Sequence, residues 1–415
     1  MSSVKAKDSF LKGAFILGMA GILVKVMGAF FRIPLGNLIG SEGMAYYQAA
    51  YPVYTLFLTL ATAGFPTALA KLVSEKNAIG DHKGAHKIFK VSYTVLFMTG
   101  ILAFLVFFFG ADYIVNNIMN NPGAKSAMLA IAPALIFVPL MSSYRGYFQG
   151  NRDMNKIAIS QIAEQFFRVI LGIGLAYFLM EGYGPELGAA GAIMGATIGA
   201  VASILYLIFA YIKGSKQRKI DIKNSKHFRD ESVMTVLKKL LVVAIPITIG
   251  ASVMPLVNMI DNVIVIDRLM VAGYTHTQAL KMFGQLTGMA MSIVNLPSVI
   301  TVAMSMSLVP AISEAFALGN KVKARKDTKS AIKVTLLIVL PCATPIMQLL
   351  YPKEPTTVGT ILLFLTPCVV FLGLIQSMNG ILQGMGKPMI PVIALVVGMI
   401  SKIVISYTLT AIPSI

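Results

Sequence analysis

The chain has 415 residues, of which 56% are hydrophobic and only 13% are charged. A soluble domain carries about 25% charged residues, so this composition excludes an ordinary water-soluble protein and predicts that many apolar side chains face lipid. The net charge of +18 would also suit a nucleic-acid-binding protein. Most of the 35 basic residues, however, fall on one side of the predicted membrane topology, which excludes that class.

The predicted elements are apolar stretches of about 20 residues, the length of helix that crosses a bilayer. We expect eleven spans, the first retained because no small-residue cleavage site follows it. With the N-terminus inside, the cytoplasmic loops collect Lys and Arg, for example at Arg145, Arg152 and Lys156. The approximate spans are 10–36, 46–70, 89–110, 126–148, 157–180, 187–212, 238–262, 283–312, 331–351, 358–382 and 389–411.

Two halves of the chain resemble each other, and the matching residues lie on the same predicted side of the membrane. This indicates two parallel-repeat six-helix lobes related by an axis along the membrane normal. We predict an N-terminal lobe at 1–212, a basic cytoplasmic linker at 213–237 and a C-terminal lobe at 238–415. The repeat also predicts a twelfth span, so the second lobe is expected to be incomplete. The matches include Ser74-Glu75 with Ser313-Glu314, and Gln149-Gly150 with Gln383-Gly384.

The first span carries two cations on one face. Gly18, Gly21, Lys25, Gly28 and Arg32 follow spacings of three and four, which place them within one arc of a helix. Charges inside a membrane usually face a cavity and have a function, and the glycines leave room for a ligand beside them. The alternative is that both cations snorkel to opposite interfaces.

The second span offers Tyr47, Tyr51 and Tyr54, an aromatic face that could stack on sugars or could instead belong to an interfacial aromatic belt. The fifth span places Glu164 and Arg168 four residues apart, near the middle of the membrane. This predicts an ion pair that either lines a transport path or only locks two helices together.

The seventh span carries Asp261 between Asn258 and Asn262, as a candidate cation or proton site or as an external helix-end carboxylate. Cys342 and Cys368 lie in apolar runs without metal-ligand spacing and are interpreted as small core residues. No nucleotide-binding loop, nucleophile elbow or metal motif is present in the sequence. We therefore expect neither an enzyme nor a cofactor, with coupling to Na⁺ or H⁺ left open.

Several segments together resemble the SpoVB/YtgP branch of polysaccharide transporters, in the superfamily of MATE exporters, Wzx flippases and lipid II flippases. The resemblance covers nearly the whole chain. It implies a V-shaped fold with a central cationic cavity and alternating access, in a bacterial cytoplasmic membrane. The segments are Phe31-Arg32-Ile33-Pro34-Leu35, Gly40-Ser41-Glu42-Gly43, Tyr47-Gln48-x-x-Tyr51-Pro52, Ala63-Gly64-Phe65-Pro66 and Lys71-Leu72-Val73-Ser74-Glu75.

The resemblance also implies a substrate, an undecaprenyl-pyrophosphate-linked oligosaccharide such as lipid II, with membrane lipids as the other partners. Arg32 stands where lipid II flippases carry a first-helix arginine, and Arg forks match phosphate oxygens. The expected substrate-binding residues are Lys25, Arg32, Arg168, Tyr51 and Gln48, and the expected ion-coupling residues are Glu164 and Asp261. Two other functions stay open: a cation-coupled multidrug exporter, and a scaffold for envelope assembly that transports nothing.

Overall fold

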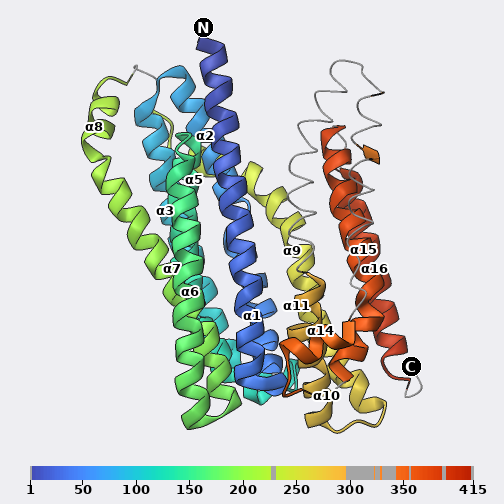
Figure 1. Ribbon diagram of the computed structural model, residues 1–415. Helices are drawn as coiled ribbons and strands as arrows, with labels where there is room; N and C mark the ends of the chain where they lie inside the picture. Colours follow the sequence, from blue (N-terminus) through green and yellow to red (C-terminus); the bar gives the residue numbers. More distant parts are fainter. Residues whose placement is uncertain are drawn as a thin grey trace. The chain divides into compact units, whose positions relative to one another are not determined.

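The computed structural model describes residues 2–225, 230–295, 322, 328–329, 343–354, 357–385 and 389–412. All secondary structure among these residues is helical, which confirms the predicted all-α polytopic fold (Figure 1). The longer helices are α1 (Ser2–Thr62), α2 (Phe65–Ile79), α3 (His82–Tyr113), α5 (Ala134–Gly150), α6 (Met154–Tyr183), α7 (Pro185–Lys213), α9 (Val233–Val271), α15 (Thr357–Gly384) and α16 (Met389–Leu409).

Shorter elements connect these helices. They are η1 (Ile114–Ile118), η2 (Pro122–Ala124), α4 (Lys125–Ile131), α8 (Ser215–Lys223), α10 (His276–Phe283), η3 (Gly284–Ala290), α11 (Met291–Val294) and α14 (Ala343–Leu350). Most of the predicted span 331–351, the end of the span 283–312, the second-half repeat at Ser313-Glu314 and Cys342 lie outside the described residues.

Eight helical stretches among the described residues are long and apolar enough to cross a membrane, so the protein is a multi-pass membrane protein. The first two predicted spans fall in one stretch, Ile16–Ile79. Within α1, Gly40 separates two helical segments with φ 65° and ψ −178°. Glycine adopts this backbone conformation without the steric cost that a side chain would add.

Local sequence explains where several helices begin and end. Pro66 lies in the first turn of α2, where a proline loses no helical hydrogen bond, and α2 ends at Gly80 in the left-handed conformation. The Asp81 carboxylate accepts a hydrogen bond from the Gly84 amide at 2.8 Å and so caps α3. Thr275 and Gln278 form a capping box that begins α10.

The contacts divide the chain into two compact units. The boundaries between the units lie inside long helices and not in the loops that connect them. The repeat-based lobes, 1–212 and 238–415, describe halves of the sequence and stay a prediction. The first unit comprises Met1–Val24, Ala49–Gly182 and Glu186–Met259, and the second comprises Lys25–Gln48, Tyr183–Pro185 and Ile260–Ile415.

The core of the first unit lies between α2, α3, α5, α7 and the first half of α9. Val236, Leu240 and Ala244 of α9 are buried in this core. The Gly64 amide also donates to Thr248 Oγ1 at 3.1 Å, and a Cβ at Gly64 would collide with the Ala244 carbonyl. Close helix contacts of this kind, through small residues, are the usual basis of packing in membranes. The first half of α9 therefore belongs structurally to the first unit.

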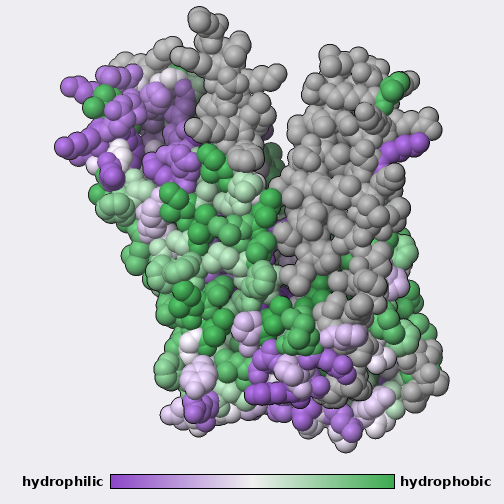
Figure 2. All heavy atoms as spheres, in the orientation of Figure 1, coloured by the Kyte–Doolittle hydropathy of each residue, from purple (hydrophilic) through white to green (hydrophobic). Residues whose placement is uncertain are grey.

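Surface composition of the first unit agrees with a membrane protein. Figure 2 shows hydrophobic residues gathered over the middle of its helices and hydrophilic residues gathered at the end where α8 lies. Large apolar side chains of this unit are exposed, such as Phe109, Phe178 and Phe209 (64–76% exposed). Apolar side chains at such exposure suit contact with lipid tails.

Candidate functional site

The second unit holds Arg32 on α1 against Ser292 on α11. Arg32 is half-buried, and its Nη1 donates to Ser292 Oγ at 3.2 Å. The Ser292 side chain is buried, and its own hydroxyl donates to the Gly288 carbonyl. Ser292 thus accepts from Arg32 through a hydroxyl that the backbone already orients. Within the described part of the chain no carboxylate forms an ion pair with Arg32, so a hydroxyl and not an anion holds this cation.

The element η3, a π-helix packed against α1, leads directly into α11 and so positions Ser292. A Cβ at Gly284 would collide with the Ser41 carbonyl, and one at Gly288 would lie 2.8 Å from Met44 Cε. Gln48 Nε2 also donates to the Thr287 carbonyl at 2.9 Å. π-Helical turns occur frequently at functional sites. Here the turn and its glycines bring two segments distant in sequence into direct contact.

Lys25 lies on the same face of α1 as Arg32, about 10 Å earlier along the helix axis. Its side chain is exposed, and it has no ion-pair partner among the described residues. Lys25 and Arg32 both belong to the second unit. The predicted cationic face of the first span is therefore present, with neither charge neutralised by a described carboxylate.

Gln48 and Asn262 form a polar contact inside the second unit. Asn262 is buried, and its Nδ2 donates to the Gln48 carbonyl at 3.3 Å. The side-chain amide of Gln48 donates its own hydrogen bond to the Thr287 carbonyl. Gln48, predicted as a substrate-binding residue, thus has a structural partner on each side.

Asp261 forms an ion pair with Lys402 of α16. Arg268, further along α9, donates to the Tyr407 carbonyl at 3.0 Å and lies over the Tyr407 ring. The sequence analysis considered Asp261 as an ion site without a partner. In the structure the Lys402 ammonium is this partner. The ion pair of Asp261 with Lys402 and the contact of Arg268 with Tyr407 join α9 and α16 at two places.

The first unit places Arg168 of α6 over the ring of Tyr51, with 5.1 Å between the guanidinium carbon and the ring centroid. Tyr51 also contacts Tyr54, whose ring centroid lies 5.9 Å away. A guanidinium over an aromatic face is a favourable cation–π arrangement. The structure thus joins the predicted aromatic face of the second span to the predicted cation of the fifth.

Glu164 is paired with Arg145 of α5, a partner that the i, i+4 spacing of Glu164 and Arg168 did not predict. Arg145 Nη2 lies 2.8 Å from Glu164 Oε2 and 3.1 Å from Ser203 Oγ, and Arg145 Nε donates to Ser160 Oγ at 2.9 Å. Arg145, predicted on the cytoplasmic side, lies near the C-terminal end of α5. A half-buried carboxylate selects the partner with the best geometry, and here this partner lies on a neighbouring helix.

Sequence reasoning missed three partners that define these clusters: Ser292, Arg145 and Lys402. Lys402 falls inside a predicted span, which is a signal for a buried partner. Ser292 and Arg145 carry no local signal that connects them with Arg32 or Glu164, because the contacts join separate segments. Among the described residues, no group of His, Cys, Asp or Glu is arranged to hold a metal ion.

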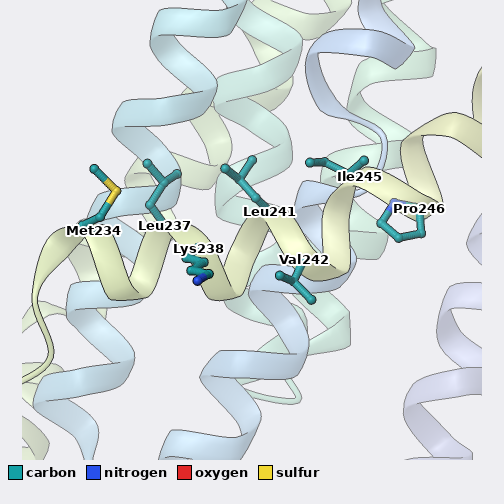
Figure 3. A pocket seen from close by; sticks show the side chains of 7 residues that line it. All are labelled: Met234, Leu237, Lys238, Leu241, Val242, Ile245 and Pro246. Carbon is teal, nitrogen blue, oxygen red and sulfur yellow. The ribbon is translucent and has the colours of Figure 1, made fainter.

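An apolar groove of about 490 Å³ runs along one face of α9 in the first unit (Figure 3). Lys238 is the charged side chain among those that line it, and the other lining residues are Met234, Leu237, Leu241, Val242, Ile245 and Pro246. None of the predicted site residues lies in this groove. It offers apolar contact only, and it contributes nothing to the cationic clusters described above.

Comparisons with known proteins place these features in a family. The model of the polysaccharide biosynthesis protein family matches residues 10–316, and the MatE family model matches residues 246–408. Stage V sporulation protein B of Bacillus subtilis is 33% identical over 85% of this chain and 69% of its own length. Lipid II flippase MurJ of the same species is 28% identical over 97% of this chain and 77% of its own length.

Solved structures agree on the fold. An inward-facing multidrug resistance MATE family transporter of the MOP superfamily matches with a TM-score of 0.74 and 16% identity, covering 97% of this chain and 91% of that one. Lipid II flippase MurJ, in an inward closed conformation, matches with a TM-score of 0.67 and 18% identity, covering 95% and 81%. The chain belongs to the polysaccharide biosynthesis protein family and is a multi-pass membrane transporter or flippase.

Proposed function

We propose that the protein is a flippase that moves a polyprenyl-pyrophosphate-linked oligosaccharide, such as lipid II or a related cell-wall precursor, across a bacterial cytoplasmic membrane. The observation that carries the proposal is the state of Arg32. Its guanidinium is oriented by Ser292 Oγ and has no carboxylate partner among the described residues. A positive charge kept in a membrane without a counter-ion is costly, and an anionic substrate would neutralise it.

The chemistry of the side chain supports a phosphate. A guanidinium has five N–H donors in a planar fork, and Ser292 occupies only one of its terminal nitrogens. The remaining donors suit the oxygens of a pyrophosphate, which accept charge-assisted hydrogen bonds. Lys25 on the same helical face adds a second positive charge, which suits a substrate with more than one negative charge.

In the first unit, Arg168 and Tyr51 offer a different surface to the same kind of substrate. The Tyr51 ring under the guanidinium suits stacking on a sugar, and the cation suits a phosphate or a saccharide oxygen. We assign Arg168 and Tyr51 to substrate contact, and keep Glu164 and Asp261 as residues that couple transport to an ion. Both carboxylates are paired with a basic residue, so a coupling ion or proton would have to compete with Arg145 or Lys402.

Similarity to MurJ favours a lipid-linked substrate over a drug, because sequence identity to MurJ extends over 97% of the chain. The Lys and Arg residues gather in the loops that are predicted to lie on the same side of the membrane as the N-terminus. Because cytoplasmic loops carry an excess of Lys and Arg, this distribution favours a cytoplasmic N-terminus.

The test is complementation in a bacterium depleted of its own lipid II flippase. The protein is expressed as wild type, as Arg32→Ala and as Arg152→Asn, a control that removes an exposed cation from a turn with φ 60°, which Asn tolerates. We expect wild type and Arg152→Asn to restore growth and the appearance of lipid II on the outer leaflet, and Arg32→Ala to restore neither.

Two outcomes would overturn the proposal. One is equal rescue by Arg32→Ala at equal amounts of protein in the membrane, which would remove Arg32 from substrate binding. The other is failure of the wild type to rescue while cells expressing it export a cationic dye, which would favour the multidrug alternative.

A further inference from the structure

Tyr351, just after α14, packs against the face of α1 that carries Arg32. The Tyr351 ring lies where a side chain at Gly36 would be, with its Cε1 only 2.6 Å from the position of a Cβ there. Gly36 follows Arg32 by four residues, so the two share one helical face. Asn37 Nδ2 donates to the Leu350 carbonyl at 2.6 Å and fixes this end of α14 on α1. The tyrosine is therefore held one helical turn from the arginine.

The hydroxyl of Tyr351 is buried and has no hydrogen-bond partner in the described part of the chain. The residue is among the largest that are completely enclosed, with 1% of its surface exposed. Buried polar groups are almost always hydrogen-bonded, and each exception needs an explanation.

We propose that the Tyr351 hydroxyl is a second donor to the phosphate group that Arg32 binds. The inference rests on the proposed function and adds to it a residue that determines affinity for the phosphate. Phosphate oxygens accept several hydrogen bonds, and a neutral donor beside a guanidinium adds directional recognition to the attraction of charge. The empty protein leaves the donor unpaired, and the bound substrate completes it.

Because the hydroxyl is enclosed, it can contact a phosphate only at a particular stage of the transport cycle. The hydroxyl is covered in this structure, so a phosphate reaches it only when the surrounding helices move, as alternating access requires. An unpaired buried donor destabilises the empty state and is satisfied in the loaded state. The contact would therefore favour the conformations that hold the substrate.

Binding measurements on the whole chain in neutral-lipid nanodiscs test this assignment. The probes are a polyprenyl pyrophosphate and inorganic pyrophosphate, and the variants are Tyr351→Phe, Arg32→Ala and the control Tyr144→Phe. Tyr144 is a buried tyrosine in an aromatic cluster of the first unit, so its change also removes one enclosed hydroxyl. We expect Tyr351→Phe to weaken both probes about tenfold, the size of one lost hydrogen bond to a charged group. Tyr144→Phe should leave both affinities unchanged.

The melting temperature without ligand gives the second readout. Tyr351→Phe keeps the ring that packs on Gly36 and removes only the unpaired hydroxyl, so the empty protein should melt at the same temperature as wild type or higher. Lower affinity together with undiminished stability is the result that a purely structural tyrosine would not give.

The outcomes separate this inference from the proposed function. If Arg32→Ala loses affinity and Tyr351→Phe does not, the tyrosine assignment is wrong and the proposed function stands. If Arg32→Ala binds both probes as wild type does, the proposed function fails and the inference fails with it. A loss confined to the lipid-linked probe would place Tyr351 at the isoprenoid chain and overturn its role as a phosphate donor.

Discussion

Arg32 in the second unit and Arg145 in the first are both half-buried arginines inside long apolar helices, and the fold treats them in opposite ways. Arg145 is surrounded by one carboxylate and two hydroxyls, from Glu164, Ser160 and Ser203. Arg32 has a hydroxyl, from Ser292, and no described carboxylate. The first arrangement neutralises the charge within the protein, whereas the second leaves the charge without a counter-ion among the described residues.

This difference shows that an intramembrane charge is not by itself evidence of a binding site. The neighbouring side chains and their distances decide whether a cation holds two helices together or is available to bind a ligand. An arginine that is neutralised should matter for stability, and one that is not should matter for transport. Substitutions can separate these two effects.

The largest expected effect on stability is at Arg145. Arg145→Met leaves Glu164 partly buried without a counter-charge, and we expect a loss of about 2–3 kcal/mol, below the full cost of a buried ion because Glu164 retains some exposure. Arg32→Met strands no carboxylate and should change stability by less than about 0.5 kcal/mol. Thermal unfolding of the two variants in the same detergent measures the contrast.

A double variant serves as the control for this comparison. Arg145→Met combined with Glu164→Leu should recover most of the lost stability, because replacing both members of a buried pair leaves no uncompensated charge. A double variant as unstable as Arg145→Met alone would mean that the hydroxyl contacts, and not the ion pair, carry the effect.

A smaller loss is expected where η3 meets α1. Gly284→Ala would drive a methyl group into the Ser41 carbonyl, and overpacking of this kind costs about 1–3 kcal/mol. Because η3 presents Ser292, the variant should also weaken pyrophosphate binding. Gly398→Ala is the matched control on α16, since its added methyl group meets no described atom within 4 Å. If Gly284→Ala melts and binds like Gly398→Ala, then η3 does not position Arg32.

The pair of Asp261 and Lys402 tests whether the second unit also contains a charge fixed by its partner. Lys402→Met should cost about 1 kcal/mol, a low value because half of the Lys402 side chain is exposed. The exchange of the two residues, Asp261→Lys with Lys402→Asp, should restore part of the loss. A coupling energy of zero in the double-mutant cycle would leave Asp261 available as an ion site.

The smallest effect concerns pH. Hydrogen bonds from Lys239 and then Lys76 hold the pKa of the Glu231 carboxyl below its usual value. A lowered folded-state pKa stabilises the fold above the unfolded pKa of about 4.3, and this contribution disappears as the pH falls through the folded value. Half of the Lys239 side chain is exposed, so we expect only a few tenths of a kcal/mol from its pair with Glu231.

Melting curves of wild type and Glu231→Gln between neutral and acidic pH measure this contribution. The two proteins should differ most at neutral pH and converge as the carboxyl of the wild type becomes protonated. A difference that stays constant over the whole pH range would exclude the ion pairs of Glu231 as its source.

Apolar run length was enough to predict most of the membrane helices, because a bilayer imposes its thickness on every span regardless of partners. Helical spacing was enough to place Lys25 and Arg32 on one face, because the geometry of a single helix is local. The first two spans were predicted as separate elements, and the structure separates two helical segments at Gly40, between the predicted spans.

The tertiary structure alone decided the partners of these residues. Ser292 meets Arg32, and Arg145 meets Glu164, across intervals of 260 and 19 residues that no periodicity connects. Spacing suggested that Glu164 would choose Arg168, the nearest cation on its own helix. A neighbouring helix offers Glu164 a cation at 2.8 Å, and Arg168 lies over Tyr51. Sequence determines which charges enter the membrane, and packing determines which remain uncompensated, because electrostatic partnership depends on distance in space and not on position along the chain.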